Sequence, residues 1–228
     1  MAKSNLLKTQ DTTFLELIGN GKKYRVPPFQ RDYSWEEEQW EDLWNDIDEL
    51  ASSPDGRHYM GALVVEAKSD RDFLVIDGQQ RLATLSILAL AVIDILGAMG
   101  GGDAEKEANR ARASGLRNRF IGERDPASLI ESSKLFLNET DDAFYQDYLV
   151  QLRTPNNPRG LPKSNRLLWE CFRWFRQRLE NRGNDSTSIA AFLSETVARQ
   201  LLFILITVED DLNAYTVFET LNARGLEL

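Results

Sequence analysis

Apolar residues recur along this chain with two periods, and these periods predict its helices and strands. Where they return every three or four positions, as at Trp40, Trp44 and Ile47, one face of a helix is indicated. The helices predicted in this way cover 12–19, 35–51, 82–98, 104–121, 141–149, 163–182, 186–199 and 212–223. The helix over 82–98 is apolar on every side, so we expect it to be buried.

Strands are predicted where short apolar runs lie between polar turns. "HYMGALVVEA" (58–67) and "DFLVID" (72–77) are joined by the polar "KSDR", which predicts a β-hairpin. Further strands are predicted in "ASLIES", "KLFLN" and "LLFILITVED". Because strands and helices interleave without repeats, the predicted fold class is α/β, or α+β, with a large helical share.

Turn-forming and capping residues predict where these elements begin and end. Ser34 is the expected N-cap of the helix over 35–51. The clearest linker is "RTPNNPRGLP" (153–162), because Pro, Asn and Gly favour loops. It separates residues 1–152 from 153–228, and we expect both parts to pack on one core. The abrupt end after "RGLEL" leads us to expect a fragment of a longer protein.

Composition narrows the class of protein. The chain has 228 residues, 42% of them hydrophobic, which is enough for one large domain. No apolar run approaches about 18–20 residues and the N-terminus lacks a secretory pattern, so we expect no membrane span and a cytoplasmic location. The single cysteine, Cys171, excludes an internal disulfide. The single histidine, His58, argues against zinc sites built from several His or Cys residues and against a His-Asn-His nuclease inside this chain.

The net charge of the chain is −9, and this negative value argues against a protein that coats nucleic acid in general. The charged residues are, however, unevenly distributed along the chain. Residues 36–49 hold eight carboxylates and no base, whereas 153–182 hold eight basic residues against two acids. Lys163, Arg166 and Arg173 in the second segment are candidate DNA contacts. The alternative is that this segment is a solvated helix face.

The stretch "FLVIDGQQRLATLSIL" places Asp77, Gly78, Gln79, Gln80 and Arg81 between a predicted strand and the apolar helix. A helix N-terminus offers unpaired N–H groups that hold anions, and the planar fork of Arg81 suits a phosphate. Asp77 is suited to a divalent cation or to a hydrogen bond from water. The alternative is that Asp77 caps the helix while Gly78 turns the chain. The Walker-type phosphate loop pattern is absent.

Two other segments carry a similar mixture of amides and arginines. "VPPFQRDYSW" contains Gln30 and Arg31, and "VFETLNARGLEL" contains Glu219, Asn222 and Arg224. The second segment also fits a glycine-terminated helix with a basic last turn, which the helix dipole favours. Because all three segments flank apolar elements, we expect them to meet in one site.

Six stretches in order resemble the N-terminal domain of GmrSD-type modification-dependent restriction enzymes, whose relatives include SspE-like proteins. They are "VPPFQRDYSWEEEQWEDLWNDI", "YMGALVV", "FLVIDGQQRLATLSIL", "SKLFLN", "SNRLLWECF" and "AYTVFETLNARGLEL". The resemblance covers about residues 12–228, and "IDGQQRL" with "FETLNARG" is its most specific pair. Ala83 departs from the threonine usual in the family, while Thr84 is kept.

The resemblance implies a ParB/sulfiredoxin-like fold, with a small sheet and a large helical elaboration. It also implies hydrolysis of a nucleoside triphosphate (NTP) that depends on the DGQQR motif. Its expected partners are the NTP, modified DNA and a His-Asn-His nuclease domain that is C-terminal or separate. The hypothesis is therefore an NTP-hydrolysing, DNA-sensing module of an anti-phage restriction system. The alternatives are a DNA-backbone-binding module without hydrolysis and a ParB-like DNA nickase.

Site roles follow from this hypothesis and from the chemistry of each side chain. The predicted catalytic residues are Asp77, Gln80, Arg81 and Gln30. The predicted phosphate contacts are Gly78, Gln79, Arg81, Arg31, Asn222 and Arg224. The predicted Mg²⁺ ligands are Asp77 and Glu219.

Overall fold

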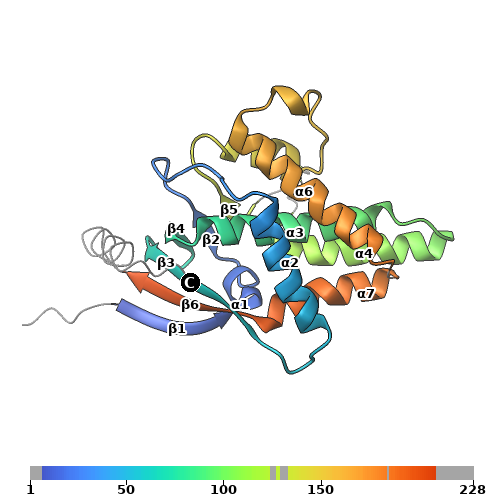
Figure 1. Ribbon diagram of the computed structural model, residues 1–228, viewed down its shortest axis with the longest axis horizontal. Coiled ribbons are helices and arrows are strands. Elements are labelled where there is room, and N and C mark those ends of the chain that lie inside the picture. Colours follow the sequence, from blue (N-terminus) through green and yellow to red (C-terminus); the bar gives the residue numbers. More distant parts are fainter. Residues whose placement is uncertain (1–6, 124–126, 129–132, 184, 209–228) are drawn as a thin grey trace, which may run out of the picture.

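A six-stranded mixed sheet and a group of helices make up the protein, which confirms the α/β class (Figure 1). The computed structural model describes residues 7–123, 127–128, 133–183 and 185–208. The predicted helix over 212–223, with Glu219, Asn222 and Arg224, lies outside these residues.

The sheet has the strand order β1-β6-β3-β4-β2-β5. Its strands are β1 (Leu7–Thr13), β2 (Lys23–Arg25), β3 (His58–Ala67), β4 (Asp72–Asp77), β5 (Leu135–Phe136) and β6 (Leu201–Val208). Strands β3 and β4 form the predicted antiparallel hairpin, with an irregularity between Val64 and Val65. Strand β6 pairs parallel to β3 and antiparallel to β1, so the C-terminal part of the described chain completes the sheet.

The helices mostly lie where apolar periodicity predicts them. They are α1 (Phe14–Ile18), α2 (Glu37–Ala51), α3 (Gln79–Ala98), α4 (Asp103–Phe120), α5 (Asp142–Phe144), α6 (Lys163–Asn181) and α7 (Ser186–Ala191). The π-helical segments Tyr145–Val150 and Phe192–Gln200 extend α5 and α7, and Pro158–Gly160 form a single 3-10 turn in the predicted linker.

Helix α3 connects the sheet to the helical side of the molecule (Figure 1). It packs against α4, α6 and α7, and most of its side chains are fully buried, as its all-round apolar pattern predicts. Helix α3 is long and apolar enough to cross a membrane. The sequence prediction of no membrane span overlooked this, because it considered only uninterrupted apolar runs. However, 78% of the most apolar 18-residue stretch of α3 is buried inside the protein, as expected for a core helix.

Two predictions about element boundaries were wrong, and one strand was missed. The predicted strand 127–132 is a turn at residues 127 and 128, and 129–132 lie outside the described residues. Helix α2 is capped by Glu36 rather than Ser34, whose backbone N–H instead donates to Gln80 Oε1 at 2.9 Å. Residues 7–13 form a strand that was not predicted, because "LKTQDTT" has no apolar period and is ordered by pairing with β6.

Candidate functional site

The junction between β4 and α3 is built around a glycine in a conformation that other residues avoid. Gly78 is the N-cap of α3 and has φ 93°. A Cβ at this position would lie 2.8 Å from Leu63 Cδ1 and 3.3 Å from the Ala62 carbonyl oxygen. The backbone therefore turns tightly against β3, and only glycine fits there without a shift of its neighbours.

The first turn of α3 presents backbone donors without acceptors. The first helical hydrogen bond runs from Leu82 N to Gly78 O at 3.1 Å. Within the described part of the chain, no acceptor is found for the N–H groups of Gln79, Gln80 and Arg81, and no side chain caps the helix. This turn also contains no acidic residue. Its partial positive charge is therefore available to an anion.

The amides of Gln30 and Gln79 join the 27–33 loop to this junction. Gln30 Nε2 donates to Ile76 O at 3.0 Å, and Gln79 Nε2 donates to Gln30 Oε1 at 3.5 Å. The structure therefore places Gln30 directly beside the end of β4, although 46 residues separate it from Ile76.

Gln80 makes a second connection between the same two segments. Its Oε1 accepts from Ser34 N at 2.9 Å, and its Nε2 donates to Asp32 O at 3.1 Å. Gln80 is only 5% exposed. Its side chain thus holds the loop in place, and its predicted catalytic role stays a prediction.

The guanidinium of Arg81 is turned inward, which differs from the free phosphate fork expected from the sequence. Its Nη1 donates to Met60 O at 2.5 Å and its Nη2 donates to Ala62 O at 2.8 Å. Nη2 also lies 3.6 Å from Asp77 Oδ2, and the Arg81 side chain is 18% exposed. Burial lowers the pKa of Arg81, and Asp77 opposes this shift. Gly61 permits the arrangement, because a Cβ there would overlap Nη1.

Two residues that the sequence analysis did not single out fix the 27–33 loop from the other side. Asn138 Nδ2 donates to Gln30 O at 2.9 Å and to Asp32 Oδ1 at 2.7 Å. Asp141 accepts from Tyr33 N at 2.7 Å. These partners lie more than a hundred residues away in sequence, so no local pattern could have identified them.

Asp141 also links this loop to α6. It accepts from Asn165 Nδ2 at 2.9 Å and is 2% exposed. Burial raises the pKa of Asp141, and the hydrogen bonds from Tyr33 and Asn165 act against that shift. A buried acceptor with two donors is well suited to hold two segments in fixed positions.

A directional chain of hydrogen bonds runs from α2 to the first turn of α3. Thr84 Oγ1 donates to Gln80 O at 2.8 Å. Because this uses the only hydroxyl hydrogen of Thr84, Tyr33 must donate to Thr84 Oγ1, 2.7 Å away. The Tyr33 oxygen in turn accepts from Trp40 Nε1 at 2.9 Å. The chain therefore connects the α2 tryptophan to the DGQQR backbone.

The cavity beside these side chains is small. Its volume is about 10 Å³, which gives room for roughly one water molecule. Its lining includes Arg31, Gln79, Gln80 and Asp141. Arg31 is exposed and makes no hydrogen bond or ion pair with any described residue. The cavity is therefore too small to hold a phosphate group.

The residues fit a Mg²⁺ ion only in part. No group of three or more His, Cys, Asp or Glu side chains that could hold a metal occurs among the described residues. Asp77 has a side chain that is 42% exposed, and Mg²⁺ is often held by one or two carboxylates together with substrate phosphates. Asp77 therefore fits as one such ligand, and Glu219 lies outside the described residues.

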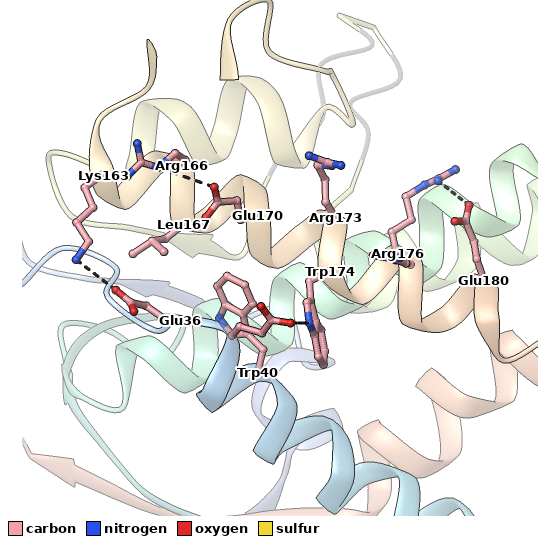
Figure 2. Close-up of a pocket in the computed structure, with 12 residues that line it drawn as sticks. Glu36, Trp40, Lys163, Arg166, Leu167, Glu170, Arg173, Trp174, Arg176 and Glu180 are labelled. Atoms are coloured by element: carbon pink, nitrogen blue, oxygen red, sulfur yellow. Dashed lines mark hydrogen bonds and ion pairs between the residues drawn. The ribbon is translucent and has the colours of Figure 1, made fainter. Parts of the chain in front are cut away.

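The three candidate DNA contacts line a separate groove between α2 and α6, of about 1070 Å³ (Figure 2). We call this the α2–α6 groove. Its lining includes Glu36, Glu37, Trp40, Lys163, Arg166, Glu170, Arg173, Trp174, Arg176 and Glu180. Trp174 Nε1 donates to Glu37 Oε1 at 3.1 Å across the groove.

Most basic groups of α6, and its C-cap Arg182, are neutralised by nearby acids. Their ion pairs are Lys163–Glu36 (3.3 Å), Arg166–Glu170 (3.9 Å), Arg176–Asp94 (2.7 Å), Arg178–Glu41 (2.8 Å) and Arg182–Asp48 (2.5 Å). Arg173 makes no ion pair with any described residue, and it projects away from α2 (Figure 2). The basic run is therefore a paired helix face at most positions, and the DNA role of Lys163, Arg166 and Arg173 stays a prediction.

The chain was compared with known protein families. Residues 14–228 match the family described as the GmrSD restriction endonuclease, N-terminal domain. This range contains the junction, the 27–33 loop and the α2–α6 groove. No curated protein matches the chain.

Proposed function

Because this chain belongs to the family of GmrSD restriction endonuclease N-terminal domains, a part of restriction and defence systems, we propose that it hydrolyses NTPs and senses DNA. In this proposal the hydrolysis regulates a nuclease domain located elsewhere, and modified DNA is the signal. The family membership supports the restriction context. The DGQQR junction supports a site for phosphates.

The observation that carries the proposal is the uncapped N-terminus of α3. Three N–H groups, on Gln79, Gln80 and Arg81, have no acceptor in the described part of the chain. Free N–H donors at a helix N-terminus suit an anionic ligand. Phosphate oxygens would satisfy these donors and benefit from the helix dipole.

Each nearby side chain then has a distinct role. Arg31, exposed and without an acidic partner among the described residues, contacts phosphate oxygens. Asp77 supplies a carboxylate for Mg²⁺, which when bound neutralises the phosphate charge. Gln30 and Gln80 position the loop, and Arg81 fixes β3 against the first turn through Met60 and Ala62.

Phosphate release from the four NTPs, with and without modified DNA, tests the proposal directly. Asp77→Asn should reduce turnover by at least ~100-fold, because a metal or charge clamp is worth several kcal/mol of barrier. Asp72→Asn is the matched control, because Asp72 starts the same strand, is similarly exposed and pairs with Arg25 at 3.9 Å. No phosphate release from any NTP, or equal loss in both variants, would reject the proposal.

A second candidate function is DNA-backbone binding without hydrolysis, which the unpaired Arg173 beside the α2–α6 groove favours. It requires DNA affinity that falls steeply with salt and no phosphate release. The many ion pairs along α6 weigh against it, because paired cations have less charge to offer a phosphate backbone.

A further inference from the structure

A second cavity shares no lining residue with the DGQQR junction. It has a volume of about 290 Å³, near the lower end of about 300–1,000 Å³ that is usual for small-molecule sites. Its walls come from Asp94 in the C-terminal part of α3, from α6 and from residues 148–154. We call it the Leu152 cavity.

Aromatic rings form much of its wall. Trp169 and Phe172 stack with ring centroids 5.4 Å apart, and Tyr148 stacks on Phe144 at 5.1 Å. Trp169, Phe172 and Tyr148 all line the cavity. Such walls favour a planar ring, because aromatic faces stack with one another.

The charged groups of the cavity differ in how they are satisfied. Arg176 Nε donates to Asp94 Oδ2 at 2.7 Å and its Nη1 donates to Glu180 at 2.6 Å, so this guanidinium is engaged. Arg173 has no acidic partner in the described part of the chain. Asp94 Oδ1, in contrast to Oδ2, accepts no hydrogen bond from any described residue. The cavity therefore offers one cation for an anion and one carboxylate oxygen for an N–H donor.

Two features of the chain make this arrangement unusual. Asp94 and Arg81 are the only charged residues of α3, which is otherwise almost entirely apolar. Leu152 has φ 53°, and it is the only residue other than glycine with positive φ among those described. Left-handed backbone is unfavourable for an L-residue, and such strain is concentrated at ligand sites.

We propose that the Leu152 cavity binds a nucleobase that carries a nearby phosphate. The ring contacts Trp169 and Tyr148, its amino group donates to Asp94, and the phosphate pairs with Arg173. The base comes from a free nucleotide or from a DNA strand, and the same chemistry serves both. This site does not include the DGQQR junction, so it does not depend on the proposed hydrolysis.

Calorimetric titration with deoxycytidine monophosphate tests the free-nucleotide source. The native chain should bind it, and Arg173→Gln should weaken binding at least ~10-fold, because one charge-assisted contact is lost. Arg166→Gln, on the same helix but outside the cavity and paired with Glu170, should leave binding unchanged. Inorganic phosphate should bind more weakly than the nucleotide, since it lacks the ring.

Single-stranded oligonucleotides test the DNA source. A deoxycytidine strand should bind more tightly than an abasic strand of equal length, because only the former carries the ring, and Arg173→Gln should weaken the binding of both strands. Binding of either the nucleotide or the strand with this dependence supports the site. Binding that ignores Arg173, phosphate bound as tightly as nucleotide, or no binding in either arm would overturn it. Phosphate release from NTP in the absence of DNA reports on the DGQQR junction alone, which shares no lining residue with this cavity, so failure here is separate from failure of the hydrolysis site.

Discussion

The DGQQR junction and the α2–α6 groove are both rich in polar residues, yet they are held together in different ways. At the junction, neutral amides and one inward arginine bond to backbone groups from distant parts of the chain. In the groove, exposed acids and bases form ion pairs, between Lys163 and Glu36 across α6 and α2 and between Arg166 and Glu170 on α6.

The difference indicates which region is rigid. Buried hydrogen bonds leave unsatisfied groups when they are broken, which costs about 1–3 kcal/mol each, whereas an exposed ion pair contributes about 0–1 kcal/mol. The junction should therefore tolerate few changes, while the groove should tolerate many. A rigid first turn of α3 suits a site that must present fixed N–H donors to a phosphate.

The largest effect is expected for Gly61→Ala. A Cβ at this position overlaps Arg81 Nη1, and φ of 93° is strained for alanine. We expect a loss of about 3 kcal/mol in unfolding free energy, measured by denaturant titration. Gly21→Ala is the control, since its φ is 75° but no atom lies within 4 Å of the new Cβ. If both variants lose the same amount, Arg81 does not hold β3 to α3.

A smaller loss is expected for Tyr33→Phe. The change removes the acceptor of Trp40 Nε1 and the donor to Thr84, so we expect about 2 kcal/mol of destabilisation in thermal unfolding. Tyr148→Phe is the control, because no hydrogen bond of its hydroxyl is found in the described part of the chain. A Tyr33→Phe protein as stable as the control would show that the hydrogen-bond chain is not formed.

The raised pKa of Asp141 should be visible in how the unfolding free energy depends on pH. Burial raises its native pKa above the usual 3.8, so the stability it contributes is fully present below 3.8 and is lost as pH rises through the native pKa. Relative to Asp141→Asn, the native chain should therefore lose unfolding free energy as pH rises above 3.8.

Asp185 provides a control with the opposite sign. Hydrogen bonds from the Ser188 backbone and side chain and from the Thr187 backbone lower its pKa, so its contribution is lost as pH falls. Denaturant titrations from pH 3 upwards compare Asp141→Asn with Asp185→Asn. The same slope for both variants would contradict the assigned burial of Asp141.

The smallest effect is expected in the groove. Lys163→Ala removes an exposed pair with Glu36 at 3.3 Å, so unfolding free energy should change by less than about 1 kcal/mol. The same denaturant titration measures this change. High salt should abolish the difference in unfolding free energy between Lys163→Ala and the native chain, because it screens the ion pair. If Lys163→Ala lost as much unfolding free energy as Gly61→Ala, the groove would not be more tolerant of change than the junction.

Most helices and strands could be predicted from the sequence, because the spacing of apolar residues is set by residues that are close together in the chain. The hairpin 58–77 and the buried helix starting near Leu82 are examples. Strand β1 could not be predicted, since its order comes from pairing with β6 about two hundred residues later. Similarly, the motif chemistry indicated a site at Asp77–Arg81, but the inward turn of Arg81 depends on two β3 carbonyls, of Met60 and Ala62, and on the space that Gly61 leaves.

The most direct test of the central claim is amide NMR of the first turn of α3 during titration with a non-hydrolysable NTP and Mg²⁺. The account predicts that the backbone amide signals of Gln79, Gln80 and Arg81 shift on binding. Those of Thr187 and Ser188, already bonded to the Asp185 side chain at the start of α7, should remain in place. Nucleotide binding that leaves the three α3 amides unchanged would contradict the claim that this helix N-terminus holds the phosphates.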